Sequence, residues 1–314
     1  MSSTDRCEPP IATAPASSTG GATARGGPLG RAPAPVICVL AMVTVQTGLA
    51  LATHLFHALG VLGTSFLRLC CAAVILLLTT RPTLRGRSRR DLAAAGLLGA
   101  ASAGMTLFFA LTTARLPLGT SATIEFLGPL SVALLLSRRP SHLAWALLAA
   151  GGVALLTLVG DGGSGHGLDP LGLLFGAAAA ACYAGYILAT HKVGAVFEGF
   201  EGLAVSITVS GVVLAPFGLG EAWHGLAVAA HPVRLVLATA GVALLLPVLP
   251  YVLEMTALRR LPERVFSILL SLEPAVSALV GLLVLGQLLD WPQLLGIACV
   301  VGASAGATLT GRQH

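Results

Sequence analysis

Hydrophobic residues fill long blocks along this chain, and short polar connections separate the blocks. From Pro35 onward, each block is close to the ~20 apolar residues that an α-helix needs to cross a bilayer. The pattern therefore predicts an all-α membrane protein in which closely spaced helices form one bundle. The ten predicted transmembrane helices lie near residues 36–53, 61–79, 92–111, 118–136, 142–159, 170–190, 201–219, 233–255, 263–285 and 292–309.

Composition also indicates a lipid bilayer as the surroundings of the chain. Hydrophobic residues make up 55% of the 314 residues and charged residues only 10%, with Lys192 as the single lysine. A soluble domain would normally carry a surface rich in Lys and Glu. The net charge of +5 sits in clusters between apolar blocks and not in a basic stripe with interleaved aromatics, so we expect no nucleic-acid partner. Residues 1–33 lack the apolar core of a signal peptide and predict a flexible cytoplasmic tail.

The positions of Arg and Lys predict the orientation of the bundle, because cytoplasmic connections carry an excess of both. With the N-terminus in the cytoplasm, 15 of the 18 basic residues fall in tails and cytoplasmic connections. The outer connections hold only Arg115 and Arg234, and Arg68 lies within the second helix. One missed helix would scramble this alternation, so it supports ten helices with both termini, including the tail at 310–314, in the cytoplasm.

Two stretches 145 residues apart repeat one another. Arg115-Leu116-Pro117 leads to Leu127-Gly128-Pro129, and Arg260-Leu261-Pro262 leads to Leu272-Glu273-Pro274. The repeat unit is five helices, and because five is odd, the second copy should insert upside down. Inverted repeats are a common architecture of secondary transporters, although a repeat kept only because it folds is the alternative. The two five-helix repeats are predicted at 34–160 and 161–309.

Ionisable residues inside the predicted helices indicate a polar pathway. A charge at the bilayer centre costs at least ~2.5–3.5 kcal/mol on insertion scales, so Arg68, Glu125 and Glu273 should face the bundle interior. With a rise of ~1.5 Å per residue, Arg68 and Glu125 both lie ~10 Å below the outer face. We predict that they pair or bind the carboxylate and ammonium of a zwitterion; a purely structural pair is the alternative. Glu273, and secondly Glu125, are predicted proton carriers, a neutral hydrogen-bonded acid being the alternative for Glu273, whereas Glu254 could reach the membrane interface.

Prolines interrupt three of the predicted helices at membrane depth. Each removes the backbone hydrogen bond to the carbonyl four residues earlier, and such backbone is tolerated only against protein or water. We therefore predict that the breaks line a central cavity, with Tyr251 as a further substrate-binding residue; ordinary kinks are the alternative. The prolines are Pro129 in the fourth helix, Pro247 and Pro250 in the eighth, and Pro274 in the ninth.

Other polar or small residues leave more than one interpretation open. Gln46, in the middle of the first helix, would hydrogen-bond either substrate or another helix. His54 and His57 have the spacing of some metal pairs, but no third ligand stands out, so we predict no metal site. Gly172 with Gly176, and Gly302 with Gly306, form faces of small residues that indicate packing within the monomer or, alternatively, a homodimer contact.

Several motifs are absent from the sequence. There is no G-x-x-x-x-G-K-[ST] phosphate-binding loop, so an ion or substrate gradient must drive any transport. There is also no H-E-x-x-H and no nucleophile elbow, and we predict neither an enzyme nor a bound cofactor.

Motifs spread along most of the chain resemble the EamA-type branch of the drug/metabolite transporter superfamily, and more closely the bacterial threonine/homoserine exporters. The resemblance implies a ten-helix inner-membrane exporter of small amino acids, coupled to protons. One departure is Gly286-Gln287, where the family often has Gly-Glu, so an acidic role cannot be carried over; the long N-terminal tail is unmatched too. The matching motifs are Ala41-Met42 with Gln46 and Gly48, Leu67-Arg68-Leu69, Pro117-Leu118-Gly119, Glu125-Phe126 with Gly128-Pro129-Leu130, Ser137-Arg138-Arg139-Pro140, Leu249-Pro250-Tyr251 with Leu253-Glu254-Met255, Arg260-Leu261-Pro262 and Glu273-Pro274-Ala275.

The sequence thus favours an exporter whose partners are a small-molecule substrate, protons and the lipid bilayer. Charges of both signs, Arg68 with Glu125, favour a zwitterionic amino acid over a flat drug, which would favour an aromatic cavity. A carrier of the same fold for another metabolite or drug remains the first alternative. A membrane scaffold without transport is the second, although it would not need charges that face inward.

Overall fold

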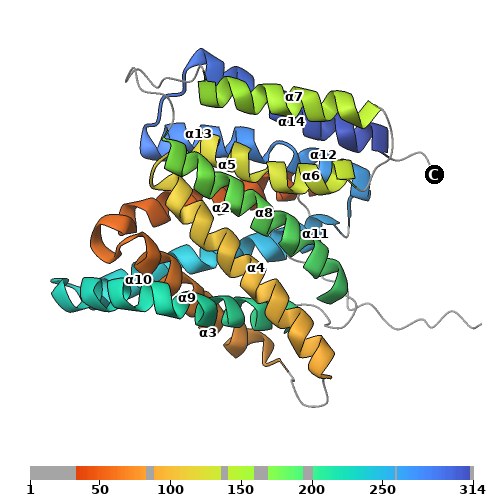
Figure 1. Ribbon diagram of the computed structural model, residues 1–314. Helices are drawn as coiled ribbons and strands as arrows, with labels where there is room; N and C mark the ends of the chain where they lie inside the picture. Colours follow the sequence, from red (N-terminus) through yellow and green to blue (C-terminus); the bar gives the residue numbers. More distant parts are fainter. Residues whose placement is uncertain are drawn as a thin grey trace, which may run out of the picture. The chain divides into compact units, whose positions relative to one another are not determined.

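The computed structural model describes residues 33–82, 88–135, 141–158, 169–193, 201–258 and 260–311, and in these ranges the secondary structure is helical without strands (Figure 1). Residues 1–32 of the predicted N-terminal tail, residues 312–314 of the C-terminal tail, and the cluster of Arg138 and Arg139 lie outside the described residues. The fold below therefore refers to the unit that begins at Pro33.

Ten helical segments make up the described chain, and three of them contain a break. The unbroken segments are α2 (Ala34–Leu59), α3 (Val61–Thr80), α4 (Arg89–Thr113), α7 (Ser141–Leu158), α8 (Pro170–Val193), α9 (Glu201–Val228) and α14 (Trp291–Gly311). The broken segments are α5 (Leu118–Glu125) with α6 (Leu127–Leu135), α10 (Pro232–Ala243) with the π-helical turn η1 (Leu244–Val248) and α11 (Leu249–Leu258), and α12 (Glu263–Leu270) with α13 (Glu273–Leu285).

Eight of the ten segments are long and apolar enough to cross a membrane. The other two are the broken α5–α6 segment and α7, in which the apolar stretch covers Ala144–Leu155. The chain is therefore an all-α, multi-pass membrane protein, as its hydrophobic pattern predicts. The predicted ends differ most at α9, which continues beyond residue 219 to Val228, because a polar turn around Glu221 extends the helix past the apolar block.

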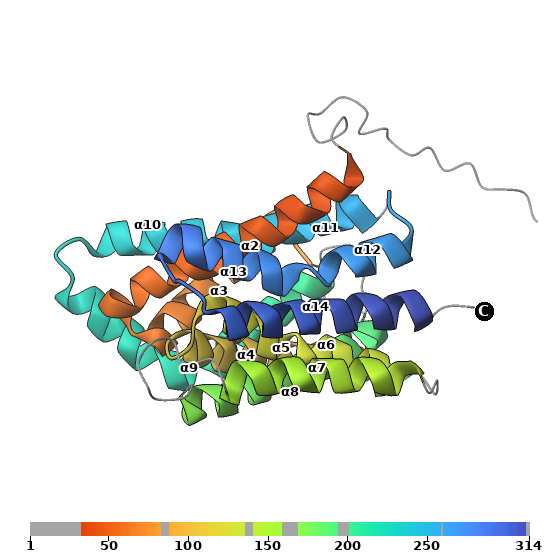
Figure 2. The ribbon, with the colours of Figure 1, turned by 90° about the horizontal axis from the view of Figure 1, so that it is seen from above.

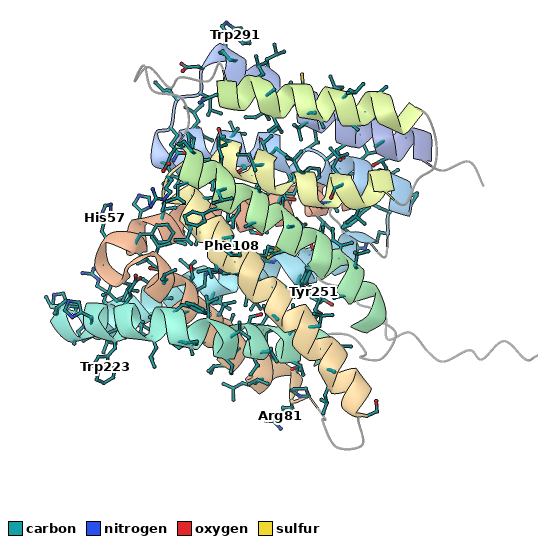
Figure 3. All side chains as sticks on the ribbon, in the orientation of Figure 1. His57, Arg81, Phe108, Trp223, Tyr251 and Trp291 are labelled. Carbon is teal, nitrogen blue, oxygen red and sulfur yellow. The ribbon has the colours of Figure 1, made fainter. Side chains whose placement is uncertain are left out.

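The two ends of the bundle differ in character. The first turn of α2 and the last turn of α14 lie at one end (Figure 2), as an even number of crossings requires. Trp223 and Trp291 are 73% and 82% exposed and lie toward the opposite end of the bundle, as does His57 (Figure 3). We call this the tryptophan end. Tryptophan is enriched where membrane proteins meet the interface, so the two side chains fit a bundle end at the lipid headgroups.

Helices from the two halves of the chain pack against each other. The most extensive pairs are α3 with α9, α4 with α8, and α7 with α14, and the two ribbon views agree on these neighbours (Figures 1 and 2). Further pairs are α4 with α9, α3 with α10, α2 with α11, α2 with α13, α8 with α5 and α6, and α5 with α13.

The faces of small residues are used within the monomer at three of four positions. Gly172 lies against Arg115 and Leu116, and Gly176 lies against Ile124. Gly306 lies under the ring of Trp145, whereas a Cβ at Gly302 would meet nothing within 4 Å. Close contact of α8 with its neighbours thus accounts for the first pair, and α14 uses one of its two glycines against α7.

Replacing Gly218 with alanine is expected to weaken the contact between α3 and α9. A Cβ there would lie 2.5 Å from the Leu62 carbonyl oxygen and 2.5 Å from Phe66 Cβ, so the helices must move apart. Overpacking of this kind costs about 1–3 kcal/mol. Gly220, two residues on, has no neighbour within 4 Å, and its alanine variant is the matched control. Thermal unfolding in detergent should show a lower midpoint for Gly218→Ala only; equal midpoints would contradict the packing described here.

Candidate functional site

A cavity of about 220 Å³ lies in the middle of the bundle, and residues from both halves of the chain line it. Its walls come from α2, α3, α4, the end of α5, α8, the start of α9, η1, α11 and the start of α13. Four ionisable side chains face this cavity: Arg68, Glu125, Glu254 and Glu273. One guanidinium and three carboxyl groups therefore share a space that is otherwise bounded mainly by apolar residues.

Arg68 lies on α3 and is only 7% exposed. Its Nη1 donates a hydrogen bond to the carbonyl oxygen of Leu246, at 3.3 Å. That carbonyl is available because the residue four positions later is Pro250, which has no N–H to donate. The break in the eighth segment therefore holds the guanidinium in the cavity wall. Among the described residues, no ion pair joins Arg68 to Glu125, so the two side chains share the cavity in this conformation without pairing.

Two of the proline breaks set the positions of carboxyl groups. α5 ends at Glu125, four residues before Pro129, and α13 begins at Glu273, directly before Pro274. Both glutamates line the cavity, whereas neither proline does. In the eighth segment the break itself lines the cavity through Leu246 and Pro247, with Leu246 in an extended conformation at φ −155° and ψ 108°.

Gln46 lies behind the cavity wall and is not one of the lining residues. It is 1% exposed, and its Nε2 donates a hydrogen bond to Glu273 Oε1 at 3.4 Å. Its Oε1 is buried and has no hydrogen-bond partner among the described residues. Of the two interpretations of Gln46, the geometry favours a bond between helices, here from α2 to α13, over direct contact with substrate.

Two tyrosines of α8, which were not among the predicted site residues, line the cavity together with Phe56 of α2 and Phe109 of α4. Tyr183 and Tyr186 line the cavity, with their ring centroids 6.5 Å apart. Tyr251 of α11, which Figure 3 labels, is not one of the residues that line the cavity. Glu254, which the sequence placed near the interface, does line it. The spacing of two tyrosines by one helical turn was the available signal for α8.

Polar contacts join the two halves at the tryptophan end. Glu221 Oε2 of α9 accepts hydrogen bonds from Leu62 N and Gly63 N, at 2.9 and 3.0 Å, in the first turn of α3. Gln287 Oε1 accepts one from Leu118 N at 2.9 Å, and Ser277 Oγ donates to the Leu118 carbonyl oxygen at 3.0 Å. Free N–H groups at the start of a helix need such acceptors.

An ion pair lies beside these contacts. Arg115 Nη1 is 2.8 Å from Asp169 Oδ2, and the guanidinium lies over the ring of Phe175, 5.9 Å from its centroid. The hydrogen bond from Arg115, assisted by the Leu171 N–H, lowers the pKa of the Asp169 carboxyl below its usual value. The carboxylate at 169 therefore stays charged to lower pH and keeps the connection before α5 attached to the start of α8.

Similar proteins of known function match nearly the whole chain. The threonine/homoserine exporter RhtA of Escherichia coli strain K12 is 37% identical over 283 residues, covering 89% of this chain and 92% of RhtA. RhtA of Salmonella typhimurium strain LT2 is 36% identical over 289 residues, with the same two coverages. The model of the EamA-like transporter family matches residues 170–309. The chain belongs to the EamA-like transporter family.

This EamA-like transporter also matches a solved structure, described only as a crystal structure of a protein, with a TM-score of 0.54. The two chains are 21% identical, and the match covers 89% of this chain and 97% of the other, so the likeness shows the fold alone. Family membership makes the chain a transporter and not an enzyme. The central cavity of the EamA-like transporter is the candidate solute site.

Proposed function

We propose that the chain exports small amino acids such as threonine or homoserine across the cytoplasmic (inner) membrane, in exchange for protons. The observation that supports this most directly is the cavity that Arg68 lines together with carboxyl groups from α5, α11 and α13. A zwitterion needs a cation for its carboxylate and an anion for its ammonium. Similarity to two exporters of threonine and homoserine over 89% of the chain favours the same solutes.

The size of the cavity favours a small solute over a drug. Pockets for drug-sized ligands typically measure about 300–1,000 Å³, and this cavity measures about 220 Å³. Its walls carry aliphatic and hydroxyl-bearing side chains together with the rings of Phe56, Phe109, Tyr183 and Tyr186. The volume therefore agrees with a substrate of amino-acid size.

Proton coupling is assigned to Glu273, with Glu125 as the second carboxyl. Each lies at a helix break and faces the cavity, so each can exchange a proton with whichever side the cavity is open to. The glutamate would bind either a proton, which makes it an uncharged acid, or the ammonium group of the substrate, but not both at once. Substrate and proton are then exchanged at one site, and no second binding site is needed.

The alternation of access is attributed to two inverted five-helix repeats, 34–160 and 161–309. In such a repeat α2 corresponds to α8, α3 to α9, α4 to α10 with α11, α5 with α6 to α12 with α13, and α7 to α14. Replacing each helix by its counterpart turns the pair α2–α11 into α8–α4, the pair α4–α9 into α10–α3, and the pair α2–α13 into α8 with α5 and α6. All of these pairs occur, and the pairs α3–α9, α5–α13 and α7–α14 turn into themselves. With both termini in the cytoplasm, the tryptophan end faces outward.

Growth on inhibitory threonine or homoserine tests the proposal. Cells that express the wild-type chain should grow at concentrations that stop cells with Glu125→Gln, because the variant lacks one carboxylate of the cavity. Glu221→Gln is the matched control, since its amide oxygen can still accept the bonds from α3 and it lies outside the cavity. Equal growth of wild type and Glu125→Gln, at equal protein levels in the membrane, would count against export of these solutes.

A further inference from the structure

Two hydroxyl groups on α4 face the cavity and take no part in the proposed binding of the zwitterion or in proton coupling. Ser102 and Thr106 are four residues apart, so they lie one turn apart on the same face of the helix. Both line the cavity, and Ser102 is only 5% exposed. They therefore form a short polar strip, which we call the hydroxyl strip, on a wall that also carries Met105, Phe109, Ala110 and Thr113, the last of which donates its hydroxyl to the Ala110 carbonyl oxygen at 3.1 Å.

The hydroxyl strip differs from the other serines and threonines that surround it. In apolar helices these side chains usually bond back to a carbonyl of the preceding turn. Thr64 donates to the Gly60 carbonyl oxygen at 2.7 Å, Ser65 to Val61 at 2.9 Å, and Thr112 to Phe108 at 2.8 Å. In the part of the chain that the structure describes, Ser102 and Thr106 make no hydrogen bond. Their hydroxyls are thus left for a group that enters the cavity.

A hydroxyl group suits a partner that is itself a hydroxyl, because each is both a donor and an acceptor. Threonine and homoserine each carry such a group on the side chain, in addition to the ammonium and carboxylate shared by all amino acids. Arg68 and the three glutamates are the groups suited to the shared carboxylate and ammonium. Tyr183 and Tyr186 also line the cavity, but the hydroxyl strip places two aliphatic hydroxyls without other hydrogen bonds in the described chain on one helix face, and this pair can distinguish a hydroxyl amino acid from an apolar one of the same size.

We propose that Ser102 and Thr106 recognise the side-chain hydroxyl of the substrate and so set the preference for hydroxyl amino acids. This rests on the proposed function, because it assumes that Arg68 holds the carboxylate and a glutamate the ammonium. The substrate would then lie between α3 and α4, with its side chain toward the hydroxyl strip. The aliphatic residues Val45 and Leu49 of α2 also line the cavity and offer no competing polar contact.

Threonine and valine make the sharpest test, because they differ only in a hydroxyl against a methyl group. Wild-type protein in liposomes should transport threonine at least about tenfold better than valine, as expected for a site that hydrogen-bonds a substrate hydroxyl. Ser102→Ala with Thr106→Val should reduce this ratio to about twofold or less, chiefly through slower threonine transport. Thr106→Ser keeps the hydroxyl and should keep most of the ratio.

Thr112→Val is the matched control on the same helix, because Thr112 is bonded to its own helix and does not line the cavity. Its threonine-to-valine ratio should equal that of the wild type. If the double variant does not reach the membrane, Thr106→Val alone replaces it and should lower the ratio severalfold. An unchanged ratio in a transporting variant, or equal losses for both amino acids, would overturn the assignment. Wild-type protein that transports neither amino acid would instead refute the proposed function.

Discussion

Replacing Arg68 with glutamine is expected to reduce export by about 100-fold or more, since truncating one partner of a buried charge contact typically costs 2–5 kcal/mol. Arg68 is the one cation that lines the cavity among the described residues, where it accompanies three carboxyl groups. Without it, no group remains to bind the substrate carboxylate. Glutamine is two bonds shorter than arginine, so the contact of Nη1 with the Leu246 carbonyl oxygen is given up as well.

Transport of labelled threonine, normalised to the amount of protein in the membrane, measures this effect. Arg81→Gln is the matched control, because Arg81 follows the last turn of the same helix and does not line the cavity. It should transport at the wild-type rate. Arg68→Lys keeps the charge but loses the fork of donors that holds a carboxylate, so partial activity is expected. If Arg68→Gln transported at the wild-type rate, the guanidinium would not be part of the substrate site.

The second large effect is expected for Glu273→Gln, which should separate substrate exchange from proton-driven export. Glutamine has the shape of the protonated acid but cannot release a proton, so a pH gradient can no longer be used. The bond from Gln46 to Oε1 can persist, since an amide oxygen accepts it as well. Threonine accumulation driven by a pH gradient should therefore fall to the background of empty liposomes.

Exchange of labelled for unlabelled threonine should continue in the same variant, because exchange moves no net proton. Measuring both activities on one preparation distinguishes a coupling residue from a merely structural one. Loss of both together would show that Glu273 is needed for binding or folding. Full gradient-driven accumulation by Glu273→Gln would exclude it as the proton carrier and leave Glu125 and Glu254 as the carboxyls to be tested.

The sequence predicted those parts of the site whose placement in lipid would cost unusually much free energy, namely charged side chains and proline breaks. Arg68, Glu125 and Glu273 are charged types within long apolar blocks, and all three line the cavity. A charge there must find a polar space, so its residue type alone indicates its surroundings. The helix breaks follow from backbone chemistry in the same way, because a proline lacks an N–H wherever the helix is placed.

Residues without such a cost could not be placed from the sequence. Gln46 follows Val45, which lines the cavity, but each residue turns the helix by about 100°, and the amide points to α13 instead. Tyr183 and Ser102 resemble the tyrosines and serines that pack between helices, and only the rotation of α8 and α4 in the bundle brings them to the cavity. Tyr251, which the sequence predicted to bind substrate, does not line the cavity, again because the sequence does not specify the helix face. Helix rotation depends on neighbouring segments, which a single hydrophobic pattern does not specify.

The glutamine at position 287 has a consequence for the environments in which this carrier can work. Its amide oxygen caps the first turn of α5 at the end of the bundle that we place outside the cell. A glutamate there would gain a proton in acidic surroundings and lose much of its hold on the N–H of Leu118. An amide does not gain a proton in this pH range, so the hydrogen bond that connects α5 to the end of α13 keeps its strength when the medium becomes acidic.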